Sequence, residues 1–168
     1  IGVMSESNLK IFSTRSDFNK FEVLSSWQKP VKAEANIELL KEYGLTHLIN
    51  KTVFFYGGNI GIAQGIDVLL DLSKSLIYDK NIHFVFIGKG DCIELLKDKS
   101  LINVTYLESL KPESYYSLVS NFDVGLFSLH SNHTAHNYPG KIWGYMSLYK
   151  PIIRVVNKGN DLKKIINK

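Results

Sequence analysis

The chain has 168 residues, of which 45% are hydrophobic and 21% are charged. This balance excludes a disordered chain and predicts one compact domain with a real core. The net charge of +4 favours anionic ligands or an anionic membrane surface, but no basic run is longer than Lys163-Lys164, so we expect no nucleic-acid partner.

The single cysteine, Cys92, has no partner for an internal disulfide, so we expect a reducing compartment and a cytoplasmic location. No apolar run reaches the roughly 20 residues that cross a bilayer, which leaves only a peripheral contact with the membrane. The chain begins at Ile1 with no signal peptide and no initiator Met, so we expect that the natural protein is longer at this end.

The first 50 residues carry short elements. We expect strands at residues 1–4 and 21–24, a helical turn at 8–12 and a helix at 33–43 that Gly44 ends. We find no repeat or linker between them and the rest. Residues 1–50 are therefore predicted to be a less regular lead-in that packs on the same sheet, within one domain of residues 1–168.

Strand and helix patterns alternate through the rest of the chain. The predicted strands are residues 52–56, 82–87, 104–107, 123–127 and 151–156. The predicted helices are residues 66–76, 93–96, 115–119 and 143–148. Near-continuous apolar strands suit a sheet covered on both faces, so we predict an α/β fold with a Rossmann-like, doubly wound parallel sheet. Ligands of such folds bind beyond the carboxyl ends of the strands.

Two glycine-rich loops follow the first two of these strands. The loop from Gly57 to Gly65 lets backbone N–H groups approach a phosphate, although a tight turn explains its glycines equally well. In the second loop, Asp91 is predicted to cap the next helix, with Glu94 completing a capping box. Lys89 lies at the edge of the sheet where it would meet a phosphate.

The stretch from Asn137 to Ile153 joins a loop, a helix start and a buried strand. Pro139 and Gly140 punctuate the loop, and Lys141 opens the helix. Because a helix start has unpaired N–H groups and a partial positive charge, a lysine there adds to an anion site. The stretch predicts a place for a diphosphate.

Other chemistries lack necessary parts. His130, His133 and His136 have a metal-like spacing, but no Cys, Asp or Glu lies among them, so solvated loop histidines are the favoured interpretation. The chain has no Gly-x-Ser-x-Gly elbow of a hydrolase and no obvious carboxylate pair for glycoside hydrolysis.

Five ordered motifs together resemble a known family. They are Tyr56-Gly57-Gly58-Asn59-Ile60-Gly61 with Gln64-Gly65, then Phe86-Ile87-Gly88-Lys89-Gly90, Asn103-Val104-Thr105-Tyr106, Asn121-Phe122-Asp123-Val124, and Pro139-Gly140-Lys141 with Tyr145-Met146-Ser147 and Lys150-Pro151-Ile152-Ile153. The chain resembles the C-terminal half of bacterial retaining glycosyltransferases of family 4, which have the GT-B fold and build O-antigen or capsular polysaccharide.

The resemblance implies a donor site without a metal or other cofactor, and it assigns no catalytic residue to this chain. It places Gly58, Asn59, Gln64 and Gly65 near the diphosphate and Gly88, Lys89 and Gly90 at the rim near the nucleotide. It gives contacts with the phosphates and the sugar to the segment that holds His136, Asn137, Gly140, Lys141 and Tyr145.

The chain departs from the family pattern at four positions. The family has basic residues where Asn59 and Gln64 stand, and glutamates where His136 and Gly144 stand, the second of which usually holds ribose hydroxyls. Losing that carboxylate removes a charge-assisted hydrogen bond of about 1.5–3 kcal/mol. We expect Lys141 to compensate for the missing basic residues.

The resemblance implies transfer of a sugar from a nucleotide diphosphate donor, expected to be a UDP-sugar, to a saccharide or lipid-linked acceptor. The acceptor would bind through a separate N-terminal domain, so we expect this half to be inactive alone. Two alternatives stay open: a degenerate, non-catalytic nucleotide-binding or scaffold module, and a Rossmann-like nucleotide-binding domain of unrelated function.

Overall fold

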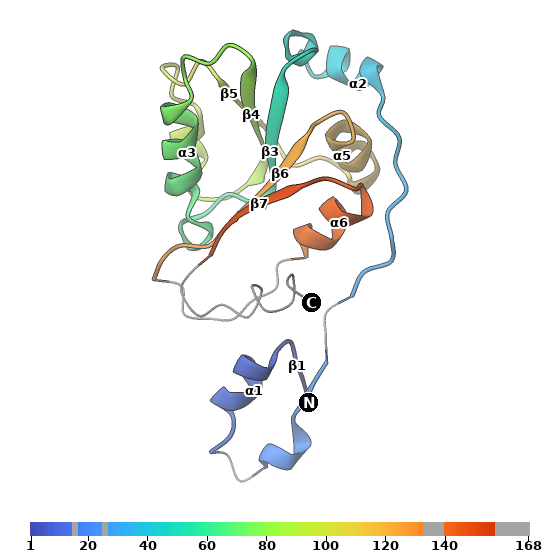
Figure 1. Cartoon of the computed structure of the whole chain (residues 1–168), viewed down its shortest axis with the longest axis vertical. Coiled ribbons are helices and arrows are strands. Elements are labelled where there is room, and N and C mark those ends of the chain that lie inside the picture. Colours follow the sequence, from blue (N-terminus) through green and yellow to red (C-terminus); the bar gives the residue numbers. More distant parts are fainter. Residues whose placement is uncertain (15–16, 25–26, 133–139, 157–168) are drawn as a thin grey trace.

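The computed structural model describes residues 1–14, 17–24, 27–132 and 140–156. A fully parallel, five-stranded sheet lies at its centre, with the strand order β5-β4-β3-β6-β7 (Figure 1). The strands are β3 (Thr52–Asn59), β4 (Ile82–Lys89), β5 (Val104–Leu107), β6 (Val124–Ser128) and β7 (Ile152–Val155). The chain winds outward from β3 to β5, returns to β6 beside β3, and winds the other way to β7. The doubly wound parallel sheet predicted from the sequence is confirmed.

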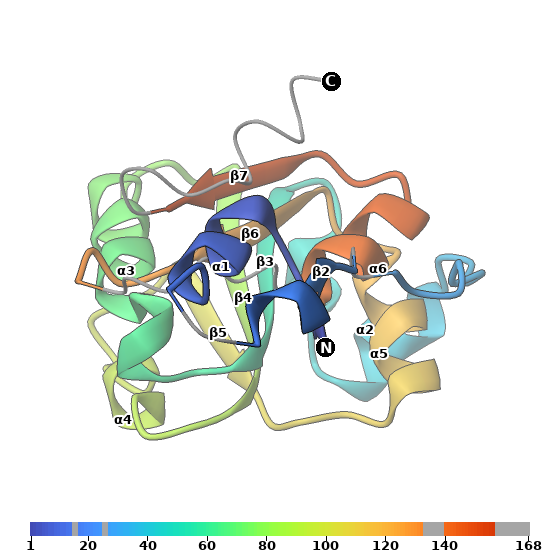
Figure 2. The ribbon, with the colours of Figure 1, turned by 90° about the horizontal axis from the view of Figure 1, so that it is seen from below.

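Helices cover both faces of the sheet, as seen from below in Figure 2. One face carries α3 (Ile66–Ser75) and α4 (Ile93–Leu96), whose apolar residues join Tyr56, Phe84 and Phe86 in one core. The other face carries α2 (Ile37–Glu42), α5 (Pro112–Val119) and α6 (Lys141–Ser147). There, Phe55, Val85 and Tyr145 belong to a second core. Successive strand residues thus serve opposite faces, because side chains alternate along a strand.

Strands β3 and β4 continue past the ends that their apolar runs predict. Gly58 pairs with Gly88, and Asn59 with Lys89, so both glycine segments belong to the ladder. A Cβ atom at position 88 would overlap the carbonyl oxygen of Gly58. The glycines therefore extend the sheet by close backbone approach, instead of releasing the chain from it.

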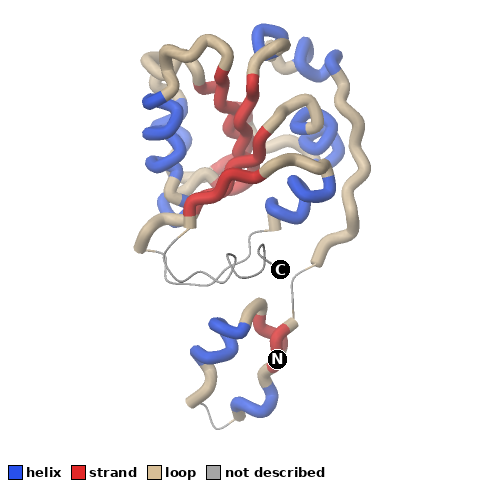
Figure 3. The backbone as a smooth tube through the Cα atoms, viewed as in Figure 1, coloured by secondary structure: helices blue, strands red, loops and turns tan. Residues whose placement is uncertain are grey.

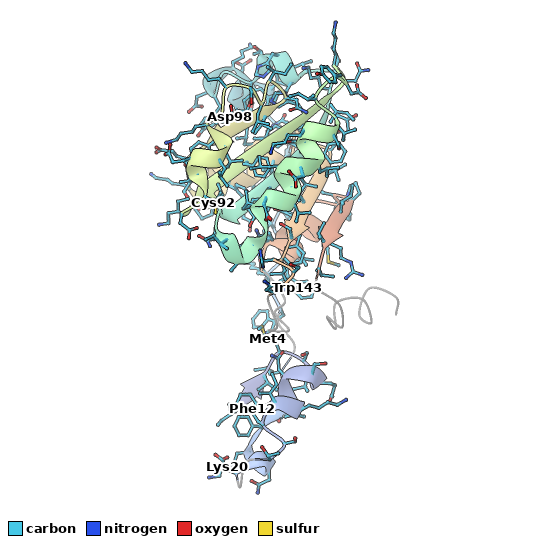
Figure 4. All side chains as sticks on the ribbon, turned by 90° about the vertical axis from the view of Figure 1, so that its left-hand side faces the viewer. Met4, Phe12, Lys20, Cys92, Asp98 and Trp143 are labelled. Atoms are coloured by element: carbon cyan, nitrogen blue, oxygen red, sulfur yellow. The ribbon has the colours of Figure 1, made fainter. Side chains whose placement is uncertain are left out.

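The start of the chain forms a small unit of its own. Strands β1 (Gly2–Val3) and β2 (Glu22–Val23) pair in parallel, with α1 (Glu6–Ile11) and η1 (Phe18–Lys20) between them. In Figure 4 this unit, with Phe12, lies away from the main sheet, and Met4 lies on the side near Trp143. Met4 packs against a small buried cluster of Phe127, Leu129 and Ile142. The extent of the domain stays a prediction.

Residues 27–36 run as an extended connection along the α5 side of the molecule, visible as the long loop in Figure 3. The Asn121 amide and the Ser120 hydroxyl donate to the carbonyls of Asn36 and Ala33, at 3.3 and 3.4 Å. Helix α2 begins at Ile37, later than predicted, because the Asn36 side chain caps it by accepting from the Glu38 amide at 2.9 Å. None of the described helices is long and apolar enough to cross a bilayer.

Candidate functional site

The strand order places a switch point between β3 and β6. From these neighbouring strands the chain continues in opposite directions along the sheet, to β4 on one side and β7 on the other. Doubly wound sheets bind ligands in the crevice at the carboxyl ends of such strands. Two hollows open at this place.

The first hollow, here called the lysine pocket, has a volume of about 310 Å³. The ends of β3 and β4, helix α5 and the loop before it, the start of α6 and one residue of the lead-in all contribute to its walls. Its lining residues are Gln28, Gly57, Gly58, Ile87, Gly88, Ser109, Leu110, Pro112, Tyr115, Tyr116, Gly140 and Lys141. The sequence-predicted residues Gly58, Gly88, Gly140 and Lys141 are thus brought together.

The ammonium group of Lys141 is the main electrostatic feature of this pocket. Its Nζ atom is buried and has no hydrogen-bond partner within the described parts of the chain. It lies 3.5 Å from the centre of the Tyr56 ring, beside Gly58. Burial lowers the pKa of Lys141 to about 7, because desolvation disfavours the charged form. An anion in the pocket would supply the missing partner.

A chain of buried phenols fixes the helix that carries Lys141. The Tyr145 hydroxyl accepts a hydrogen bond of 3.0 Å from the Gly57 amide, and its ring packs edge-on against Phe55 at 4.8 Å. Burial raises the pKa of Tyr145 to about 12. Burial, and then interactions with Tyr145 that include a side-chain hydrogen bond, also raise the pKa of Tyr115. Both phenols therefore stay protonated near neutral pH and act through hydrogen bonds.

The second hollow, here called the amide pocket, has a volume of about 440 Å³ and opens beside the end of β3. It is lined by Asn59, Gly61, Ile62, Ala63, Gln64, Asp91, His130 and Asn132. The Asn59 amide donates to Oε1 of Gln64 at 2.8 Å, so these two predicted site residues bind each other. Among the residues that the structure describes, no Lys or Arg lines this hollow, which makes this part of the wall a poor place for a phosphate.

Asp91 differs from its predicted role. Helix α4 begins after Cys92, and no side chain caps it. The Asp91 carboxylate instead reaches back to Gly61, where an added Cβ atom would lie 2.8 Å from its Oδ1 atom. The loop before α4 keeps Asp91 at the amide pocket, so the capping-box prediction is wrong.

The remaining predicted site residues have varied positions. The Lys89 side chain is exposed at the end of β4. Gly65 has a left-handed backbone (φ 60°) between η3 (Ile62–Gln64) and α3, and Gly90 approaches the Ile60 carbonyl. His136 and Asn137 lie outside the described residues. The binding roles of all these residues stay predictions.

Metal-binding groups are absent from the described parts of the chain: no three or more His, Cys, Asp or Glu side chains there are arranged to hold an ion. Of the three histidines with metal-like spacing, His130 lines the amide pocket, while His133 and His136 lie outside the described residues.

Eight of the twelve residues that line the lysine pocket are not among the predicted site residues, and Gln28, Tyr115 and Tyr116 are three of these eight. The tyrosines belong to a helix whose apolar spacing indicates core packing. Gln28 lies in the irregular lead-in, and nothing in the sequence predicts its distance from α5. The sequence feature that could have indicated this wall is the aromatic pair Tyr115-Tyr116, which follows strand β5.

Comparison with known proteins places the chain among glycosyltransferases. No protein-family profile matches it. It is 30% identical over 122 residues to the probable glycosyltransferase WbjE of Pseudomonas aeruginosa, a match that covers 70% of this chain and 30% of that protein.

Solved structures agree on the fold. WaaG, a glycosyltransferase involved in lipopolysaccharide biosynthesis, superposes with a TM-score of 0.70 at 11% identity, over 99% of this chain and 51% of WaaG. HepE of Anabaena, solved with UDP and glucose, superposes with a TM-score of 0.67 at 14% identity, over 99% of this chain and 52% of HepE. The chain therefore spans about half the length of these proteins, and under a third of WbjE.

Proposed function

From the premise that this chain is the C-terminal domain of a GT-B glycosyltransferase, we propose that it binds the sugar donor of the transfer reaction, a UDP-sugar. The single observation that carries the proposal is the buried Lys141 ammonium group, which has no hydrogen-bond partner among the residues described. A buried charge is costly until it is paired, so the pocket is built for an anion that comes from outside.

The neighbouring groups suit a diphosphate. Lys141 stands at the switch point of the sheet beside Gly58, whose missing side chain leaves the backbone open to a ligand. The solved structures support the choice of ligand, because HepE has been solved with UDP-glucose, and TarM of S. aureus with UDP. On this proposal the diphosphate binds in the lysine pocket.

In the reaction, the UDP leaving group gains negative charge as the bond to the sugar breaks. Lys141 would stabilise this charge, since a charge-assisted hydrogen bond from a buried ammonium group strengthens as charge develops. We propose that this lysine does the work without a metal ion. Transfer with retention, and membership of family 4, are part of the same proposal.

The acceptor side of the proposal concerns the rest of the enzyme. A saccharide or lipid-linked acceptor would bind to an N-terminal domain, and the complete enzyme would work in the cytoplasm, peripheral to the membrane. The role of WaaG in lipopolysaccharide biosynthesis supports this class of acceptor. O-antigen or capsule assembly is the proposed setting.

Calorimetric titration of the chain with UDP tests the donor site. We expect measurable binding that falls at least about tenfold in Lys141→Met, because a charge-assisted hydrogen bond is worth roughly 1.5–3 kcal/mol. Lys74→Met is the matched control, since Lys74 lies on α3 with a 57% exposed side chain. No binding at millimolar UDP by the folded chain, or equal binding by both variants, would refute the proposal.

A non-catalytic binding module is the second candidate. The observation that favours it is the amide pocket, where Asn59 and Gln64 bind each other and none of the described lining residues is a Lys or Arg. If charge has been lost from an ancestral donor site, the double variant Asn59→Arg, Gln64→Lys should bind UDP at least tenfold more tightly. Unchanged affinity would indicate a site that is complete without those charges.

A further inference from the structure

We propose that Tyr116 and Gln28 bind the ribose hydroxyl groups of the donor nucleotide and make the site selective for ribonucleotides. This inference rests on the proposed function, because it needs a nucleoside diphosphate anchored at Lys141. It concerns a different wall of the lysine pocket and a different part of the ligand.

The position of Tyr116 follows from the glycine at position 144. Gly144 is buried in α6, and a Cβ atom there would lie 3.0 Å from Cε1 of Tyr116 and 3.2 Å from its hydroxyl oxygen. The absence of a side chain at 144 thus leaves room for the Tyr116 ring against the helix. The phenol occupies the space that a longer residue at 144 would otherwise fill.

The spacing of Lys141 and Gly144 along α6 indicates which part of the ligand lies near Tyr116. Gly144 is three residues after Lys141, so the two positions lie on one face of α6, about one turn or 5 Å apart. A ligand whose phosphates are held at Lys141 and whose nucleoside extends towards α5 therefore presents its ribose at the level of Tyr116. Tyr116 and Lys141 both line the lysine pocket.

The hydrogen-bonding pattern suits a diol. The Gln28 amide nitrogen donates to the Tyr116 hydroxyl oxygen at 3.2 Å. The phenol therefore still has its proton to donate, and the Gln28 carbonyl oxygen can accept. Of two neighbouring ribose hydroxyls, one can accept a hydrogen bond from the Tyr116 phenol and the other can donate one to the Gln28 carbonyl oxygen. A deoxyribose satisfies only part of this pair.

The Tyr116 ring is held in place before a ligand arrives, and Gln28 is hydrogen-bonded to its hydroxyl group. The ring of Tyr116 packs edge-on against Tyr115, with ring centres 5.2 Å apart. Tyr115 in turn interacts with the buried Tyr145. Gln28 comes from the extended connection that is tied to α5 by the hydrogen bonds of Ser120 and Asn121. A prepared pair loses less entropy on binding than a free one.

Calorimetry with UDP, 2′-deoxy-UDP and 3′-deoxy-UDP tests the inference on the 168-residue chain. We expect UDP to bind about tenfold more tightly than at least one deoxy analogue, the effect of one hydrogen bond. In Tyr116→Phe the ratio of the UDP affinity to the affinity for that deoxy analogue should fall to about 1, because UDP binds more weakly and binding of the analogue is unchanged. Gln28→Ala, at an exposed position that leaves the core intact, should reduce the discrimination against at least one of the two deoxy analogues. Tyr78→Phe, with Tyr78 92% exposed, is the control.

The outcomes separate the two proposals. If the chain binds UDP but does not discriminate against either analogue, or if Tyr116→Phe and Gln28→Ala both keep the full discrimination, the ribose inference is overturned and the donor site stands. If the chain binds none of the three nucleotides, both are overturned. A loss of the ratio in Tyr116→Phe and Gln28→Ala, with Tyr78→Phe unchanged, supports the inference.

Discussion

The hydroxyl group of Tyr145 accepts a hydrogen bond of 3.0 Å from the amide of Gly57, and this contact ties α6 to the end of β3. Tyr145 stands one turn after Lys141 on the same short helix, so the bond fixes how the lysine meets the pocket. Gly57 itself leaves no room for a side chain, since a Cβ atom there would overlap the Tyr115 hydroxyl. Strand end and helix are therefore positioned by one another.

Removing this hydroxyl should destabilise the chain. In Tyr145→Phe the buried Gly57 N–H group has no acceptor, which costs about 1–3 kcal/mol of unfolding free energy. Urea denaturation followed by circular dichroism measures the change. Tyr149→Phe is the matched control, because Tyr149 is 95% exposed. Equal stability of the two variants would show that the hydrogen bond contributes nothing.

Replacing Lys141 should stabilise the folded chain while it harms the site. The pKa of Lys141 is lowered to about 7 in the fold, against 10.5 for an ordinary lysine. Between these pKa values the unfolded chain binds more protons than the folded chain, so stability rises with pH from about 7 to 10.5. The free-energy cost of burying the charged Lys141 ammonium group is therefore fully present below pH 7. Lys141→Met should remove the cost, a gain of up to roughly 5 kcal/mol near pH 7. Thermal unfolding at pH 6 to 10 measures it, and a variant less stable than the parent at pH 7 would contradict this account.

The same lysine should make UDP binding depend on pH. Above pH 7 the empty site holds a neutral Lys141, and binding of the diphosphate must draw in a proton. Affinity should therefore fall from pH 7 to 9, by at most about tenfold per unit. Calorimetry in buffers of different ionisation enthalpy detects the proton uptake. Lys141→Met should bind weakly at every pH with no such slope, and a parent chain whose affinity is flat from pH 7 to 9 would rule out this coupling.

The sequence predicted the sheet well because its strands are long apolar runs that need cover on both faces. Phe54 to Tyr56 and Phe84 to Phe86 carry enough β-branched and aromatic neighbours to mark them. Their extensions through Gly57-Gly58-Asn59 and Gly88-Lys89 do not follow from the sequence pattern, because glycine normally ends a strand and here makes close pairing feasible.

Of the site, sequence reasoning found Lys141 but not what surrounds its nitrogen. The Lys141 ammonium group is buried against Tyr56 and Gly58, which belong to a strand more than 80 residues earlier in the chain. The contact between Gln28 and Tyr116 also joins distant parts of the sequence, since these residues are 88 positions apart. Such contacts are set by packing between elements, which local patterns do not encode.

A buried histidine should make the fold sensitive to acid. His83 is 3% exposed in β4, and its Nε2 atom lies 2.9 Å from the Thr105 hydroxyl. Burial first, and then the charges of His47 and Lys51, lower its pKa to about 4. The unfolded chain therefore takes up this proton first, so stability should fall as the pH drops from about 6.5 to about 4, by at most roughly 3 kcal/mol.

The variant His83→Gln separates this effect from general acid denaturation. Glutamine keeps a hydrogen-bonding side chain near Thr105 and does not titrate, so the loss of stability between pH 6.5 and 4 should become shallower. His130→Gln, which changes a partly exposed histidine beside the amide pocket, is the matched control. Denaturation curves at half-unit pH steps decide the matter, and equal slopes for all three chains would mean that His83 is not responsible.

The contact between Gly144 and Tyr116 should appear as a coupling between two substitutions. Gly144→Ala favours helix formation by about 1 kcal/mol, but the added methyl group would press on the Tyr116 ring at 3.0 Å. We therefore expect little or no gain in the parent chain and the full gain in a Tyr116→Ala background, where the ring is absent. Unfolding free energies of the four chains give the coupling directly. Additive effects would show that Tyr116 does not occupy the space above Gly144, and would remove the structural basis for its proposed contact with the ribose.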